Sequence, residues 1–244
     1  MLATVKTTSG GFTKGDMFFG NGPRIGWLSA EGTVSNLNWC MMTNSTTTNT
    51  IDIRGGLYVD QSGSFGGDLI VVTGGSSLDE GGGVWRVNSN GIPKLLVNIT
   101  NQAHPHLEGV VTLTNDVQRW GPWAGKIITG GESKIPPLIH AIDTNGTVMS
   151  FDLGIAPEDF DVIPPNQDLY CVDQQAAKIV KVPHEVLTNY WGDLLITQEG
   201  EFVGSPALFI VHWNGSTANF ESHTIPYINA FEHVTFAPTN LFGP

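Results

Sequence analysis

Short runs of apolar residues, each closed by a polar turn, alternate along almost the whole chain. The most regular runs begin at a glycine, and each is followed by a second apolar run that ends in a turn with glycine. The glycine-led runs are Gly15–Phe19, Gly67–Thr73, Gly125–Thr129 and Gly192–Thr197, and the second runs are Ile25–Gly32, Val84–Gly91, Ile139–Gly146 and Leu208–Gly215. Several of these turns are Asn-Gly, a strong hairpin signal because both residues tolerate positive φ. The pattern predicts four β-hairpins in series.

Two further strands complete each repeat. The third strands are Thr33–Trp39, Lys94–Ile99, Thr147–Leu153 and Ala218–Thr224, and the fourth strands are Gly56–Asp60, Glu108–Leu113, Asp159–Ile163 and Glu232–Phe236. Four-stranded antiparallel units in series are typical of a β-propeller, in which neighbouring blades cover each other's faces. We therefore expect an all-β protein, with one small propeller domain over residues 1–244. A two-sheet sandwich is the alternative, but it does not require this internal period.

The two ends of the chain leave open how the ring closes. We favour closure by the C-terminal strand, Glu232–Phe236, which would complete the N-terminal blade, remove a free sheet edge and give four blades. In the alternative, Leu2–Thr8 is the inner strand of the first blade, and the chain is a propeller fragment or has five blades. An additional hairpin at about residues 166–190 is interpreted as an insertion, or else as half of a fifth blade.

Composition narrows the choice of partners and compartment. The chain of 244 residues has a net charge of −12 and only 11 basic residues, which argues against a nucleic-acid partner. It has no apolar stretch as long as a membrane span. No signal peptide is visible, yet the Thr-rich, Lys-poor composition favours an extracellular or periplasmic location. Cys40 and Cys171 could form one disulfide or remain two separate thiols.

The loops that lead into the inner strands of a propeller meet at one end of its channel, where function usually lies. Glu108, Asp159, Glu232 and Arg54 occupy equivalent positions in these loops. Three carboxylates on one axis raise each other's pKa, so they need a compensating charge. A hard cation such as Ca²⁺, bound by Glu108, Asp159 and Glu232, would supply it, and so would Arg54. The alternative is that these acids cap strand ends in separate places.

Histidines stand beside these acidic positions. His104, His106 and His233 are candidate general bases, with Glu108 as a further catalytic candidate, since only histidine titrates near neutrality without perturbation. The loops after the glycine-led strands point to the same end. Together with the loop before the second blade, they supply the candidate binding residues Asn21, Arg54, Glu132 and Glu199.

The segment His106-Leu107-Glu108-Gly109-Val110 and the turn Asp143-Thr144-Asn145-Gly146 resemble bacterial propellers with NHL-like repeats. That group includes the senescence-marker-protein/gluconolactonase and paraoxonase-like lactonases. The resemblance implies that a glutamate leading into an inner strand holds a catalytic divalent cation with acids or amides of other blades. Glu108 matches that glutamate, and Asp159 and Glu232 would be its partners. The four repeats depart from the six blades of that group, and Arg54 is foreign to a ring of metal ligands.

Two functions are consistent with this sequence. The first is a metal-assisted hydrolase of lactones or esters, with a small polar, perhaps sugar-derived, substrate whose carbonyl the cation polarises. The second is a non-catalytic extracellular module that binds a carbohydrate or a protein through the same loops. The chain has no Gly-x-Ser-x-Gly elbow, phosphate-binding loop, Cys-x-x-Cys pair or His-Glu-x-x-His helix.

Overall fold

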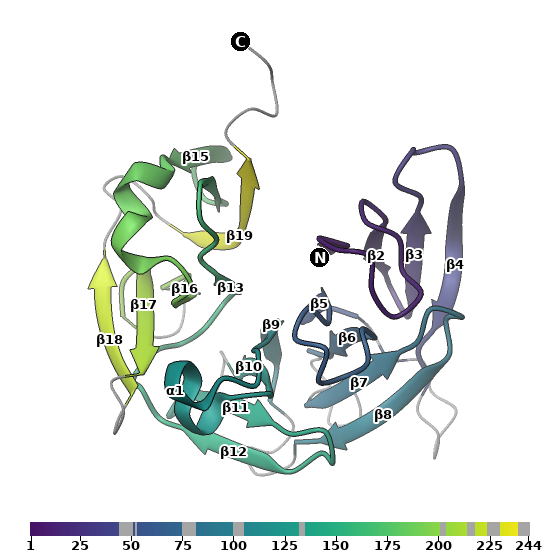
Figure 1. Ribbon diagram of the computed structural model, residues 1–244, viewed down its shortest axis with the longest axis horizontal. Coiled ribbons are helices and arrows are strands. Elements are labelled where there is room, and N and C mark those ends of the chain that lie inside the picture. Colours follow the sequence, from purple (N-terminus) through teal and green to yellow (C-terminus); the bar gives the residue numbers. More distant parts are fainter. Residues whose placement is uncertain are drawn as a thin grey trace.

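A computed structural model provides the architecture, in which five sheets are arranged like blades around one axis (Figure 1). It describes residues 1–43, 51, 53–74, 82–99, 105–131, 135–200, 204–213, 218–223 (backbone only) and 230–238. All strands that pair within a sheet are antiparallel. The all-β propeller predicted from the repeats is confirmed.

The blades are numbered by the position of their inner strands along the chain. Blade one contains β1 (Leu2–Thr4), β2 (Met17–Asn21), β3 (Arg24–Leu28) and β4 (Ser35–Met41). Blade two contains β5 (Gly56–Val59), β6 (Leu69–Val72), β7 (Gly83–Val87) and β8 (Pro93–Asn98). Blade three contains β9 (Leu107–Thr112), β10 (Ile127–Gly131), β11 (Leu138–Ile142) and β12 (Val148–Phe151). Blade four contains β13 (Phe160–Val162), β16 (Leu194–Gln198), β17 (Ala207–Trp213) and β18 (Ala218–His223). Blade five contains β19 (Phe231–Pro238), β14 (Gln167–Asp173) and β15 (Lys178–Val182).

The number of blades differs from the four that we favoured. The predicted hairpin at about residues 166–190 is present as β14 and β15, but it is not an appendage of blade four. It pairs with β19 over Gln167–Asp173 and makes a three-stranded fifth sheet. The alternative interpretation, half of a fifth blade, is therefore the correct one.

The favoured closure of the ring is also wrong, because the C-terminal strand does not join the N-terminal blade. Strand β1 already occupies the inner edge of blade one, where Leu2 pairs with Phe19. Strand β19 instead places Phe231 and Phe236 in a core shared with blade four. Burial of these two aromatic side chains gives β19 a packing partner as well as a hydrogen-bonding one.

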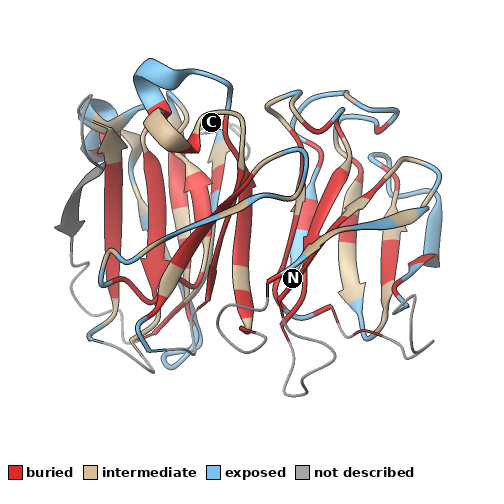
Figure 2. Cartoon of the chain, turned by 90° about the horizontal axis from the view of Figure 1, so that it is seen from below, coloured by how far each residue is buried: buried red, intermediate tan, exposed pale blue. Residues whose placement is uncertain are grey.

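Buried residues run along the strands on both sides of the molecule (Figure 2), and their side chains cluster between neighbouring blades. Four clusters of buried side chains join blades one and two, two and three, three and four, and four and five. Among the described residues no such cluster joins blade five to blade one. In the part of the chain that the structure describes, shared cores thus join four pairs of neighbouring blades, and blades five and one have no shared core.

The backbones of blades two, three and four are in contact near the axis. Gly109 of β9 has φ 56°, and a β-carbon there would lie 2.7 Å from the Cα of Asp159 in the next blade. Its N–H donates a 3.2 Å hydrogen bond to the carbonyl of Gly55 in the preceding blade. Blades two, three and four thus meet backbone to backbone at this level, because position 109 carries no side chain.

Among the described residues, three short helical segments lie outside the sheets. They are α1 (Val117–Trp120), η1 (Gly121–Trp123) and η2 (His184–Tyr190). Trp120 and Trp123 pack into the core of blades three and four, and Arg119 donates hydrogen bonds to the carbonyls of Trp191 and Gly192. In the described part of the chain, no helix has the length and apolar character needed to cross a membrane.

The two cysteines are separate thiols. Cys40 is buried in blade one and Cys171 in blade five. Burial raises the pKa of Cys40 to about 11 and that of Cys171 to about 12. Both thiols therefore stay protonated near neutral pH, which makes them poor nucleophiles.

Candidate functional site

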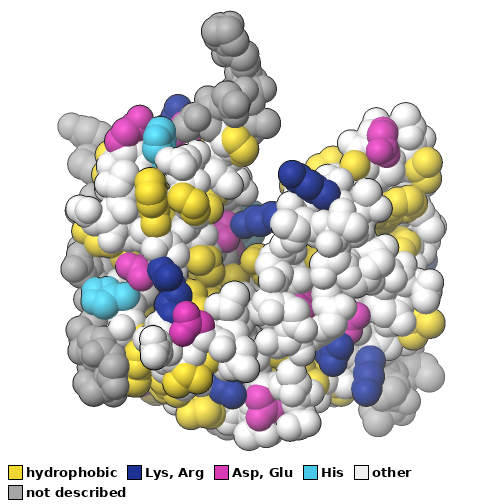
Figure 3. Space-filling model, viewed as in Figure 1, with side chains coloured by type: hydrophobic (Ala, Val, Ile, Leu, Met, Phe, Trp, Pro, Cys, Tyr) yellow, Lys and Arg dark blue, Asp and Glu magenta, His cyan; other side chains and the backbone are white. Residues whose placement is uncertain are grey.

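A cavity of about 440 Å³ follows the propeller axis and extends between blades five and one. All five inner strands contribute to its wall, and β14 and β15 add Tyr170, Val172 and Ile179. Figure 3 shows the molecule hollowed between these two blades, with charged side chains near the opening and hydrophobic side chains deeper inside. The volume lies within the range of roughly 300–1,000 Å³ that is typical of small-molecule sites.

One end of the cavity holds a carboxylate and an imidazole from different blades. Asp159 directly precedes β13, and His233 lies in β19, with 3.9 Å between Asp159 Oδ2 and His233 Nδ1. The carboxylate is held by backbone donors, because Oδ2 accepts the N–H of Val234 at 3.1 Å and Oδ1 accepts the N–H of Phe160 at 2.8 Å. Burial raises the pKa of Asp159, although the charge of His233 opposes this.

A second acid and imidazole lie near the axis on blade three. Glu108 of β9 forms an ion pair with His106 Nε2, and its side chain is only 12% exposed. Burial raises the pKa of Glu108 above its usual value, and the neighbouring His106 partly offsets the rise. The charges of His233 and Glu232 also act on Glu108, so β9 and β19 bring these groups near one another. A β-carbon at Gly74 would overlap the ring of His106, so the glycine leaves the space that this ring occupies.

An ion pair crosses the cavity between blades one and four. The Lys6 ammonium, which follows β1, lies 3.0 Å from both carboxylate oxygens of Asp161 in β13. The same ammonium stands 5.9 Å from the centre of the Tyr58 ring. Burial raises the pKa of Tyr58, with the charge of Asp161 adding to the effect, so the phenol stays neutral. Sequence reasoning missed this pair, because its partners are 155 positions apart and neither belongs to a recognisable motif.

The structure brings together some of the predicted site residues and separates others. Asp159 and His233 line the cavity, and Glu108, His106 and Glu232 lie close to them but are not part of its wall. The other predicted residues lie elsewhere or outside the described residues. Asn21 and Arg54 are exposed, Glu199 is half-buried in the loop after β16, none of these three lines the cavity, and His104 and Glu132 fall outside the described residues.

The three predicted metal ligands are not clustered around one point in this arrangement. Among the described residues, the ligand atoms of Glu108, Asp159 and Glu232 do not all come within 4.8 Å of one another. The carboxylates of Glu108 and Asp159 are also already engaged, by His106 and by two backbone N–H groups. The calcium ion predicted from the sequence stays a prediction, and no step below depends on it.

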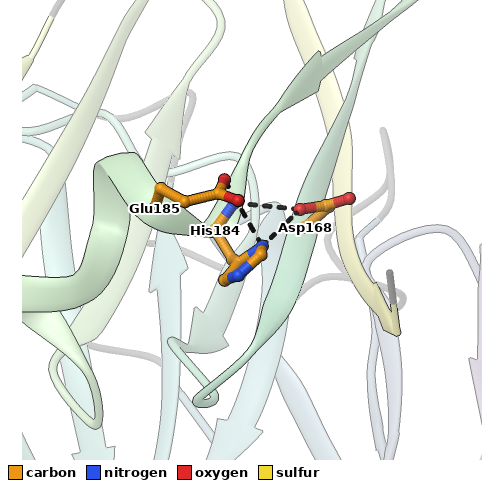
Figure 4. Close-up of side chains that lie close together, drawn as sticks. All are labelled: Asp168, His184 and Glu185. Atoms are coloured by element: carbon orange, nitrogen blue, oxygen red, sulfur yellow. Dashed lines mark hydrogen bonds and ion pairs between the residues drawn. The ribbon is translucent and has the colours of Figure 1, made fainter. Parts of the chain in front are cut away.

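The one group of described residues with metal-like spacing is Asp168, His184 and Glu185, in blade five and the helix η2 that follows it (Figure 4). Its buried carboxylate already has an ion-pair partner and a hydrogen-bond donor. Asp168 Oδ2 lies 2.6 Å from Lys181 Nζ, and Oδ1 accepts the backbone N–H of His184 at 2.9 Å. These donors lower the pKa of Asp168 to about 2. The group acts as an ion-pair network that fastens the start of η2 to β14.

The raised pKa of Glu108 predicts an unusual pH dependence of stability. A carboxyl group whose pKa is higher in the folded state binds more protons there, so the free energy of unfolding falls as pH rises from the usual pKa through the raised one. Glu108→Gln removes this titration. We therefore expect the variant to be more stable than the wild type at pH 8 and similar to it at pH 4.

Urea unfolding at both pH values measures this difference. Glu31→Gln, at an exposed position of blade one, is the control and should change the free energy of unfolding by less than about 0.5 kcal/mol at either pH. A Glu108→Gln variant less stable than the wild type at pH 8 would contradict the prediction.

Fold and site together define a class: a five-bladed β-propeller with a ligand-sized cavity on its axis. No known protein family matches the sequence, and no curated protein matches it. A solved structure that is similar in fold is a catalytically inactive virginiamycin B lyase from Staphylococcus aureus, crystallised with quinupristin. It has 12% sequence identity and a TM-score of 0.44, over 94% of this chain and 82% of that one. No functional assignment follows from a likeness of this extent.

Proposed function

We propose that this protein hydrolyses a small ester or lactone in its axial cavity, with His233 as the general base. The observation that carries the proposal is the Asp159–His233 pair, which lines a cavity of ligand size. A histidine close to a carboxylate is a frequent arrangement in general-base catalysis, since histidine takes up a proton near neutral pH, and here the 3.9 Å separation is that of an ion pair. Backbone hydrogen bonds from Phe160 and Val234 hold the carboxylate in place.

Glu108, which lies next to the cavity and not in its wall, is the proposed general acid. Its raised pKa keeps part of the population protonated at higher pH than an exposed glutamate would allow. The charges of Glu108 and His233 interact, and such a pair follows the pattern in which neighbouring titratable groups take opposite roles because their environments differ. His106, packed against Gly74, holds the side chain of Glu108 on the axis.

The reaction consumes one water molecule. His233 takes a proton from water while the water oxygen bonds to the carbonyl carbon of the substrate. The acyl carbon–oxygen bond then breaks, and the leaving alkoxide takes a proton from Glu108. Transfer of the proton from His233 back to Glu108 through solvent restores both groups. The products are a carboxylic acid and an alcohol, joined in one molecule when the substrate is a lactone.

Turnover by the purified protein tests the proposal. Acid release is followed in a pH-stat with phenyl acetate, γ-nonalactone and gluconolactone, with and without EDTA. We expect hydrolysis of at least one of them, with kcat/KM falling as the pH rises through the raised pKa of Glu108. Loss of activity in EDTA would mean that the predicted cation is needed for hydrolysis. Binding without turnover of any substrate would favour the non-catalytic alternative.

A further inference from the structure

Two strongly exposed aliphatic side chains line the cavity from opposite blades. Ile179 of β15 is 70% exposed and Leu2 of β1 is 62% exposed, although both face the cavity. Tyr170 and Val172 of β14 continue the apolar surface from Ile179 toward the axis. Apolar area left in water costs about 25 cal/mol per Å² relative to burial, so this lining favours an apolar occupant.

The junction of blades five and one differs from the other junctions between blades. At the four other places where blades meet, the facing side chains form shared cores. Between blades five and one, the described residues enclose a cavity of about 440 Å³ instead. Its apolar side walls come from two different blades, and its polar end is the Asp159–His233 pair.

The charges and polar groups of the cavity are largely satisfied by one another. The Lys6 ammonium contacts both oxygens of Asp161. The Gln61 side chain accepts a hydrogen bond from the Thr7 hydroxyl and donates one to the carbonyl of Val59. A ligand that enters with many hydroxyl groups would lose hydration and find few partners in exchange, whereas an uncharged apolar ligand would lose little.

We propose that the cavity between blades one and five binds an uncharged amphiphilic ligand, with an alkyl or aromatic body against Leu2, Tyr170, Val172 and Ile179 and a carbonyl group toward His233. The proposal deepens the proposed function, because it assigns the substrate to the apolar esters or lactones. It departs from the sugar-derived substrate that the sequence suggests.

Binding of a ketone that cannot be hydrolysed tests the inference apart from the chemistry. Calorimetric titration of the full chain uses 2-heptylcyclopentanone as the amphiphilic probe and glucose as the polar one. We expect saturable binding of the ketone and binding of glucose that is at least about tenfold weaker, equivalent to about 1.4 kcal/mol. Glucose binding as tight as that of the ketone would overturn the inference.

A matched pair of variants locates the binding. Ile179→Asp places a charge in the apolar wall at an exposed position, and Ile92→Asp places the same charge at a 60%-exposed position of blade two. Ile179→Asp should weaken ketone binding about tenfold or more, and Ile92→Asp should leave it unchanged. Equal effects, or none, would overturn the inference. Ketone binding without turnover of any ester would refute only the proposed function, and gluconolactone turnover without ketone binding would refute only this inference.

Discussion

Replacing His233 by alanine should lower kcat/KM for the preferred ester or lactone by about 10²–10⁴-fold, the usual contribution of a general base. The imidazole lies in the cavity next to Asp159, and the substitution removes the group that takes the proton from water. Its side chain is 43% exposed, so the free energy of unfolding should change by about 0.5 kcal/mol or less. Steady-state kinetics and urea unfolding of the same preparation measure both effects.

His184→Ala is the matched control for this experiment. His184 also pairs with an aspartate, with 3.0 Å between its Nδ1 and Asp168 Oδ1, but it does not line the cavity. The control should therefore keep wild-type kcat/KM. If both variants lost the same activity, loss of a histidine–aspartate pair anywhere in the fold would account for the result. If His233→Ala kept full activity, His233 could not be the base.

Phe231→Ala should lower the free energy of unfolding by about 3–5 kcal/mol, the usual cost of removing a buried phenylalanine. Phe231 is fully buried at the start of β19, in the core that joins blades four and five with Leu195, Leu208 and Ile210. The loss would remove contacts from both blades, because this core is their shared interface. Equilibrium unfolding in urea, followed by tryptophan fluorescence, gives the value.

Leu37→Ala, at a 57%-exposed position of β4, is the control and should cost less than about 0.5 kcal/mol. A similarly small effect for Phe231→Ala would mean that the C-terminal strand is not packed in blade five. The expected loss of unfolding free energy in Phe231→Ala, with wild-type stability in Leu37→Ala, would support the arrangement in which β19 belongs to blade five and not to blade one.

The strands themselves could be read from the sequence because their signals are local. The glycine-led runs, the Asn-Gly turns and the alternation of apolar positions each depend on neighbours a few residues away. The predicted strand Glu108–Leu113 is observed as Leu107–Thr112, and Lys94–Ile99 as Pro93–Asn98. The hairpin of β14 and β15 was visible for the same reason, even though its blade was not.

The candidate site could be predicted only in part. Glu108 and Asp159 stand out because each leads into an inner strand, and strands that share a direction bring such positions to one end of the ring. The Lys6–Asp161 pair and the apolar wall of Ile179 carry no such signal. The ion pair joins blades one and four across the cavity, between segments 155 positions apart. Ile179 belongs to the junction of blades five and one, which the predicted four-blade ring did not contain.

The sequence by itself thus determined the all-β class, the repeated strands and the acidic positions around the axis. Only the tertiary structure decided the number of blades, the partner of the last strand and the place of the cavity. The physical reason is that backbone hydrogen bonding is generic, so β19 could pair with any free sheet edge. When β19 pairs with β14, Phe231 and Phe236 become buried against blade four. This contact joins segments that are far apart in the chain, so no local sequence signal reports it.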